Sequence, residues 1–335
     1  MIARELVALP SYAREVEEGL TRGPKSLPSK LFYDGPGSVL FEEITHLPEY
    51  YLTRTELEIL RARGTEIAEA VGPNVTVVEL GAGTATKTGT LLRALATRQI
   101  RTSYFPVDIS PSALAEAKAQ VQAQIPKALV RPIVADFSEG FDFLRDIPGR
   151  KLVLYLGSSI GNFDPEAAVS MLTAVRKKLN PGDALLLGTD LVKPSTILIP
   201  AYDDARGITA QFNRNILRRL NRELGTGFYV NAFRHVACWN AVCSRMEMHL
   251  QSQCRQIVSL GILGSKVTFA ACERIHTENS YKYTMPVVKS MLNDAGFALD
   301  QTWFDDKKWF ALNLARVNQG VTKIEDGSDK SRFRL

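Results

Sequence analysis

Two glycines stand where a nucleotide could be bound. Gly81 and Gly83 follow the apolar run Val75–Leu80, and a helical pattern begins a few residues later. Glycine has no side chain, so the backbone of such a turn can closely approach a ligand that lies over the strand ends. A dinucleotide-binding turn has a third glycine at the position held here by Thr86, so NAD is a weaker prediction.

Acidic residues end three successive strand-like runs. Glu79 and Asp108 fall at the carboxyl edge of the predicted sheet, where a carboxylate can accept both hydroxyls of a ribose. Asp136 could accept an exocyclic amine and Phe137 could stack on adenine; the alternative is that Asp136 caps a turn and Phe137 is core. Lys87 could lie near the carboxylate of the cofactor, or be solvated. Three acids with a two-glycine turn favour S-adenosylmethionine over a dinucleotide.

A second candidate group lies far along the chain. Glu278 and Ser280 are two residues apart in an extended-looking segment, so both side chains would lie on one face of a strand. Solvent-facing polar residues would show the same spacing. Met248 lies in an alternating strand pattern, where a core methionine is the default interpretation.

Alternating elements are needed to position the nucleotide turn. Helical patterns separate a series of short apolar, β-branched runs, at residues 75–80, 103–108, 129–136, 151–157 and 183–191. Continuous apolar strands separated by helices predict a doubly wound, mostly parallel sheet covered on both faces.

The alternation stops after Leu191. The pattern then predicts a long helix at about 203–224, a hairpin over 236–252, and a further strand and a loop across 266–284, before a helix at 285–297 and a last strand at 309–316. The stretch from about 195 to 283 is therefore interpreted as an insertion. It would pack with the N-terminal helices predicted across residues 38–70.

Two local expectations concern helix starts and the chain end. The helical pattern of residues 38–70 is broken at 48–51, and Thr53 or Thr55 is expected to cap the helix that follows. Residues 319–335 are polar without periodicity, and we expect them to form a flexible tail.

Composition excludes several classes of protein. The 335 residues are 45% hydrophobic and 23% charged, which is typical of a globular protein. The formal charge is +5, but lysines and arginines are scattered, so neither a nucleic-acid nor a membrane partner is expected. No run approaches a membrane span or a secretory signal, so we expect a cytoplasmic protein.

The cysteines raise the question of a metal site. All four, Cys238, Cys243, Cys254 and Cys272, fall in one segment with several histidines. No Cys-x2-Cys or His-x3-His pair is present, so we expect no metal and interpret the cysteines as core thiols.

Several segments together resemble the histidine-specific, S-adenosylmethionine-dependent methyltransferases, the histidine Nα-methyltransferases of the ergothioneine pathway. They fall in order along nearly the whole chain, at residues 30–34, 47–56, 79–84, 156–162, 187–204, 212–215 and 277–283. The resemblance implies a class I methyltransferase domain at 58–194 and 284–318. It also implies an α+β substrate-binding domain at 1–57 and 195–283.

The resemblance also implies a reaction, three methyl transfers to the α-amine of L-histidine that give hercynine. Tyr33, Asn162 and Tyr202 would then be catalytic, lying nearest the amine and carboxylate, and Tyr50 would help to hold the carboxylate. Hydroxyl and amide groups can orient an amine without a strong charge that would keep it protonated.

The same resemblance implies that Glu278, Ser280 and Met248 bind the imidazole ring. Glu278 would accept from one ring N–H, Ser280 would pair with the other ring nitrogen, and Met248 would form an apolar wall. The predicted cofactor contacts are Gly81, Gly83, Lys87, Asp108, Asp136 and Phe137. A monomer is favoured over an oligomer.

Other functions stay open from the sequence. The same fold could methylate another amino acid or a small amine. The +5 charge alone suggests an RNA-binding methyltransferase or a non-catalytic cofactor sensor. Oxidoreduction with NAD ranks last because of Thr86.

Overall fold

The computed structural model describes residues 10–317. Its larger sheet has eight strands, and β4, β3, β2, β6 and β7 lie in that order. These strands pair in parallel, while β14 and then β13 extend the sheet antiparallel beyond β7. The strands are β2 (Val75–Leu80), β3 (Ser103–Asp108), β4 (Leu129–Val130), β5 (Ile133–Val134), which pairs with β3, β6 (Arg150–Tyr155), β7 (Ala184–Asp190), β13 (Phe297–Phe304) and β14 (Phe310–Val317).

Helices cover both faces of this sheet. One apolar cluster joins the sheet to α6 (Phe143–Asp146), α7 (Pro165–Arg176) and α10 (Met285–Asp294). Another joins its opposite face to α3 (Tyr51–Val71), α4 (Thr88–Ala96) and α5 (Pro111–Gln124). Every residue of β2 and β7 is buried, which explains why both sequences are predominantly apolar. The predicted doubly wound sheet is therefore confirmed.

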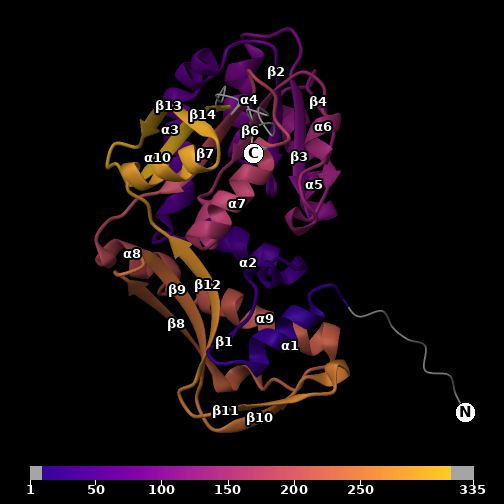
Figure 1. Cartoon of the computed structure of the whole chain (residues 1–335), viewed down its shortest axis with the longest axis vertical. Helices are drawn as coiled ribbons and strands as arrows, with labels where there is room; N and C mark the ends of the chain where they lie inside the picture. The colour runs from indigo at the N-terminus through magenta and orange to yellow at the C-terminus, as the bar shows by residue number, and fades with distance from the viewer. Residues whose placement is uncertain (1–9, 318–335) are drawn as a thin grey trace, which may run out of the picture.

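A second, four-stranded sheet occupies the lower half of Figure 1. Its order is β1 (Lys25–Ser26), β12 (Arg274–Tyr281), β9 (Arg245–Ser252) and β8 (Phe233–Asn240), with β1 parallel to β12. Beside it lie α1 (Ala13–Thr21), α2 (Gly35–Thr45), α8 (Ser195–Tyr202), α9 (Ile208–Leu224) and the hairpin β10 (Gln256–Ser259) and β11 (Lys266–Phe269). Short 3-10 helices are η1 (Ser29–Phe32), η2 (Phe137–Glu139), η3 (Ser159–Asn162), η4 (Val230–Ala232) and η5 (Gly261–Leu263).

The N-terminal helices and the later segment share one core. A single cluster includes Val16 and Leu20 of α1 together with Ile216 of α9 and Ile275 of β12. This packing supports the predicted second domain, although its boundaries stay a prediction. Within residues 10–317, no helix is long and apolar enough to cross a membrane.

Several local predictions were wrong. The helix α3 begins at Tyr51, so Thr55 lies inside it and donates to the Tyr51 carbonyl at 3.1 Å instead of capping. The helix expected at about 203–224 begins later, as α9 at Ile208, and a separate short helix, α8, precedes it at Ser195–Tyr202. The predicted flexible tail, 319–335, lies outside the described residues.

The cysteines are not core residues. Cys243, Cys254 and Cys272 are exposed and Cys238 is half-buried. Apolar neighbours in the sequence do not bury these thiols, because Cys243 follows the edge strand β8 in a turn and Cys254 lies beyond the end of β9.

Candidate active site

Seven predicted side chains line one pocket. They come from segments far apart in the sequence, three of them from β9 and β12 of the smaller sheet, and they are Tyr33, Tyr50, Asn162, Tyr202, Met248, Glu278 and Ser280. These are all of the residues predicted to bind the substrate or take part in the chemistry. Their roles stay predictions, but their convergence in space is a finding.

Local hydrogen bonds position the two N-terminal tyrosines. Tyr33 is followed by Asp34, which caps α2 by accepting from Gly37 at 2.8 Å and also accepts from Asn215 of α9 at 2.7 Å. Tyr50 precedes α3, and the guanidinium of Arg54 donates at 2.6 Å to two carbonyls of the loop before it. The segments that carry both phenols are thereby held in fixed turns.

A close backbone approach positions Asn162. A Cβ atom on Gly161 would lie 2.9 Å from the carbonyl oxygen of Tyr281, so only glycine lets η3 approach β12 this closely. At the start of η3, Ser158 has a positive φ of 58°, and its hydroxyl accepts from the backbone of Asp190 at 2.8 Å. Asn162 thus lines the same pocket as Glu278 and Ser280.

Ser280 is not a free hydroxyl. Its oxygen lies 2.7 Å from the Tyr202 hydroxyl and 2.8 Å from Nζ of Lys282. Lys282 also donates to the Tyr202 hydroxyl at 2.7 Å and forms an ion pair with Asp190 at 2.7 Å. Ser280, which is predicted to bind the ligand together with Glu278, is therefore held by a buried lysine. The sequence patterns assigned no role to this lysine.

Glu278 is a buried carboxyl facing the pocket. It is 9% exposed, and burial raises its pKa to about 8, although the charge of Lys282 opposes this shift. Among residues 10–317, no side chain or backbone group donates a hydrogen bond to it. A buried acceptor that the protein leaves unused is suited to a ligand N–H.

Aromatic rings form much of the wall. The ring of Phe41 lies 5.6 Å from that of Tyr33, 6.3 Å from Tyr50 and 5.9 Å from Phe212, and Tyr50 lies 6.4 Å from Tyr202. Phe41 and Phe212 line the pocket but were not singled out from the sequence. Phe212 begins the matched segment 212–215, which could have indicated it, whereas Phe41 lies between the matched segments 30–34 and 47–56.

A buried charged group lies behind the pocket. Asp190 accepts from Tyr51 at 2.7 Å and pairs with Lys193 at 2.5 Å as well as with Lys282. Burial lowers the pKa of Lys193 to about 8, against the opposing effect of Asp190. This group ties α3, β7 and β12 together where the two sheets meet.

The nucleotide turn has the geometry expected of it. Gly81 and Gly83 both have positive φ, 70° and 50°, and a Cβ atom at either would meet no atom within 4 Å. Half-buried Asp108 ends β3, and its carboxylate accepts from the backbone of Gly83 and of Ser110, each at 3.0 Å. Open space beside a carboxylate and a bare backbone fits the adenosine end of S-adenosylmethionine.

Glu79 does not serve this turn as the ribose acceptor. It is 4% exposed, accepts from Thr88 at 2.6 Å and from the Tyr104 hydroxyl, and has a pKa raised to about 7 by burial. It therefore joins β2 to α4 and β3, and Asp108 stays the predicted ribose acceptor.

The remaining cofactor predictions have other neighbours. Lys87 forms an ion pair with the buried carboxylate of Glu56, which also accepts from the backbone of Gly157 at 2.8 Å. Phe137 stacks on Phe141, with ring centroids 5.5 Å apart, and is half-buried; Asp136 precedes it at the start of η2. Contact of Lys87, Asp136 and Phe137 with the cofactor stays a prediction.

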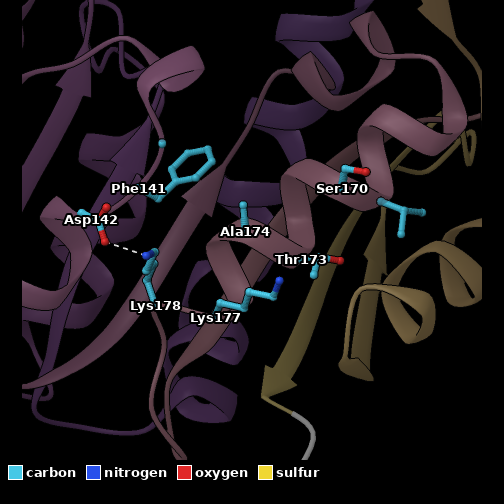
Figure 2. Close-up of a pocket in the computed structure, with 9 residues that line it drawn as sticks. Phe141, Asp142, Ser170, Thr173, Ala174, Lys177 and Lys178 are labelled. Atoms are coloured by element: carbon cyan, nitrogen blue, oxygen red, sulfur yellow. Dashed lines mark hydrogen bonds and ion pairs between the residues drawn. The ribbon is translucent and has the colours of Figure 1, made fainter.

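A larger cavity lies elsewhere. Figure 2 shows it between α7 and the loop before α6, with a volume of about 440 Å³. Its walls carry an ion pair between Lys178 and Asp142 at 2.5 Å, and Asp142 is well exposed. None of the predicted side chains lines it, and a solvated surface ion pair offers no catalytic group, so chemistry favours the smaller pocket over the larger one.

One group resembles a metal site in composition. Cys238, Glu247 and His249 place one ligand atom each within 4.8 Å of one another. However, the Glu247 carboxylate is already bound by Arg245 at 2.8 Å and by Asn240 at 2.9 Å. A guanidinium on the shared carboxylate disfavours a cation there.

Fold and site together define the class of protein. A parallel, doubly wound sheet presents a two-glycine turn and a carboxylate at its carboxyl edge, as expected for a class I S-adenosylmethionine-dependent methyltransferase. The family described as histidine-specific, SAM-dependent methyltransferases matches residues 12–317. The chain belongs to this family.

Two curated relatives match over nearly their whole length. The histidine N-alpha-methyltransferase of Mycolicibacterium smegmatis is 44% identical, with 92% of this chain and 95% of the relative covered. That of Mycobacterium tuberculosis is 46% identical, with 90% and 94% covered. Among solved structures, the CcbJ methyltransferase from Streptomyces caelestis is 16% identical, with a TM-score of 0.44 and coverage of 76% of this chain and 95% of that one.

Proposed function

We propose that this protein transfers three methyl groups from S-adenosylmethionine to the α-amine of L-histidine and gives hercynine, an early step of ergothioneine biosynthesis. One observation carries the proposal: the buried, unpaired carboxyl of Glu278 lies in a single pocket with Tyr33, Tyr50 and Asn162. The carboxyl suits a ring N–H, and the phenols and amide suit the amino-acid end. Family membership and the two histidine methyltransferase relatives support the same substrate.

The tyrosines orient the amine without acting as bases. Burial raises the pKa of Tyr33 and of Tyr50 well above its ordinary value, so both phenols keep their hydrogen at neutral pH. A neutral phenol can hydrogen-bond an amine or a carboxylate without stabilising an ammonium as an ion pair would. The pocket thus favours the neutral amine, whose lone pair the reaction needs.

Repeated methylation calls for a wall that tolerates a growing cation. When bound, S-adenosylmethionine supplies a sulfonium methyl group, and each methyl added to the amine removes an N–H donor. The rings of Tyr33, Phe41 and Tyr50 offer π-faces to a cation that can no longer donate. Between successive methyl transfers, only the contacts that depend on the N–H groups of the amine weaken.

The proposal extends to partners and location. We place the enzyme in the cytoplasm as a monomer that acts on a small molecule, without a nucleic-acid or membrane partner. The scattered basic residues of the sequence support this. Light scattering on the purified protein would test the monomer, since a dimer would double the mass.

Mass spectrometry tests the reaction. Histidine incubated with the enzyme and S-adenosylmethionine should gain three methyl groups, while a panel of other amino acids and small amines should gain none. Methylation of another amine with no change in histidine would contradict the substrate but not the fold. That outcome would favour the alternative, a methyltransferase of the same fold for another amino acid or small amine.

A further inference from the structure

Three polar groups form a closed triangle at the wall of the pocket. The hydroxyls of Tyr202 and Ser280 lie 2.7 Å apart, and Nζ of Lys282 lies 2.7 Å and 2.8 Å from them. All three side chains are buried, and Tyr202 and Ser280 line the pocket. Lys282 is behind them, between the hydroxyls and Asp190.

The hydrogens in this triangle can be counted. Burial lowers the pKa of Lys282, while Asp190 at 2.7 Å favours the ammonium. An ammonium has three hydrogens and no acceptor, and its three neighbours here are a carboxylate and two hydroxyl oxygens. Each hydroxyl oxygen therefore accepts from Lys282, and both hydroxyl hydrogens must point away from it.

One of these two hydrogens stays within the pair. At 2.7 Å one hydroxyl donates to the other. A phenol is the more acidic donor and an aliphatic hydroxyl the better acceptor, so Tyr202 donates to Ser280. The oxygen of Ser280 then accepts from both Lys282 and Tyr202, and its own hydrogen is the one left for the pocket.

We infer that Lys282 is a specificity-determining, positioning residue, which makes Ser280 a hydrogen donor to the ligand and prevents it from acting as an acceptor. The inference rests on the proposed function, because it concerns the ring of bound histidine. Tyr202 acts in it through Ser280, as its hydroxyl is already committed to protein partners.

The consequence is a pocket of defined polarity. The oxygen of the Glu278 carboxyl that carries no hydrogen, whether or not the group is protonated, accepts at one side of the ring, and Ser280 donates at the other. A neutral imidazole with one N–H and one lone pair satisfies both groups, whereas a ring with N–H groups at both nitrogens or with CH facing Ser280 does not. A buried donor without an acceptor is costly, so we expect the pocket to bind histidine on the order of 100-fold more tightly than a ring that leaves Ser280 unmatched.

A second lysine provides a matched control. Lys193 is also buried and pairs with Asp190 at 2.5 Å, but its other hydrogen bonds go to Tyr51 at 2.8 Å and to the Leu191 carbonyl. It forms no hydrogen bond with Tyr202 or Ser280. Replacing either lysine by glutamine removes one buried charge from the same aspartate, but only Lys282→Gln changes the hydroxyl pair.

The experiment measures binding by calorimetry in the presence of S-adenosylhomocysteine. The ligands are histidine and the two pyrrolylalanines, in which one ring nitrogen is replaced by CH. Wild type and Lys193→Gln should prefer histidine about 100-fold over the pyrrole that presents CH to Ser280. In Lys282→Gln the preference for histidine over this pyrrole should fall below about 10-fold, because the Gln oxygen can accept the hydrogen of the Ser280 hydroxyl.

Nitrogen NMR of ring-labelled histidine bound to wild type provides a readout that needs no variant. One protonated and one unprotonated ring nitrogen are expected at pH 7.5, and two protonated nitrogens would overturn the inference. It would also be overturned by a Lys282→Gln enzyme that keeps the 100-fold preference. If wild type binds S-adenosylhomocysteine but not histidine, the proposed function itself fails, and the inference with it.

Discussion

The carboxylate of Glu56 accepts a hydrogen bond from the backbone N–H of Gly157 at 2.8 Å, which joins α3 to the loop that follows β6. Glu56 is fully buried, and the ammonium of Lys87 pairs with it. The loop leads into η3 and Asn162, and Gly157 itself lines the pocket. One buried carboxylate thus contacts both a glycine that lines the pocket and a lysine that is predicted to contact the cofactor.

Loss of this carboxylate should damage both ligand sites. Glu56→Ala leaves the Gly157 N–H and Lys87 without a partner, so the free energy of unfolding should fall by about 3 kcal/mol. Urea denaturation would measure this fall. Histidine and S-adenosylhomocysteine should both bind more weakly, and an unchanged affinity for both would contradict the positioning role of Glu56.

Glu278 should make stability depend on pH. Its pKa in the folded protein is about 8 against an ordinary 4.5, so between these values the folded state holds a proton that the unfolded state has lost. Stability is therefore lost as the pH rises from 4.5 to 8. Glu278→Gln removes the buried ionisable group, and by pH 8.5 it should be more stable than wild type by on the order of 3 kcal/mol.

Thermal or urea unfolding at pH 5 and pH 8.5 checks this trend. Glu247, on the neighbouring strand β9, is the control. Burial works to raise its pKa, but hydrogen bonds from Asn240, Arg245 and His249 outweigh burial and lower it to about 2. Glu247→Gln should therefore show no gain in stability between pH 5 and 8.5. An equal gain for both variants would refute the explanation by burial.

The same carboxyl should govern substrate binding. Glu278→Ala removes the acceptor for the ring N–H, so histidine affinity should fall at least about 100-fold, while affinity for S-adenosylhomocysteine changes little. Calorimetry with each ligand measures both. Equal losses for the two ligands would count against a role at the imidazole.

Asp108 should be specific to the cofactor. Asp108→Asn replaces one of two acceptor oxygens with a donor, so S-adenosylhomocysteine should bind roughly tenfold more weakly, or worse. Glu79→Gln is the matched control, because Glu79 is committed to Thr88 and Tyr104. If Glu79→Gln weakened the cofactor and Asp108→Asn did not, the assignment of the ribose acceptor would be reversed.

Phe41 should matter most in the last methyl transfer. Phe41→Leu keeps an apolar wall but removes a π-face, worth about 0.5–1 kcal/mol to a cation. Dimethylhistidine should therefore accumulate several-fold relative to hercynine, as measured by mass spectrometry. Val39→Leu, at an exposed position of the same helix, should leave the product ratio unchanged.

Sequence patterns predicted the parallel sheet well, because strands buried on both faces must be continuously apolar. The spacing of Glu278 and Ser280 predicted a shared strand face, and both side chains do line one pocket. Periodicity did not predict the partners of Ser280. Lys282 belongs to the same strand segment, but a lysine in a sequence carries no sign that Asp190 lies 2.7 Å away.

Other failures have the same physical origin. No local pattern indicates a polar partner for Tyr51, yet its hydroxyl donates to Asp190, a contact across 139 positions of the chain. Glu79 looked like a ribose acceptor because it ends a strand, but Thr88 and Tyr104 occupy its oxygens. Local patterns predict elements, whereas pairing of buried polar groups depends on contacts between distant segments.

A structure of the complex with histidine and S-adenosylhomocysteine tests the central claim most directly. We predict that a ring nitrogen will lie within hydrogen-bond distance of the Glu278 carboxylate, with the other facing Ser280, and that the α-amine will point towards the sulfur among Tyr33, Tyr50 and Asn162. Histidine bound with its ring away from Glu278, or with its amine directed away from the sulfur, would contradict the account.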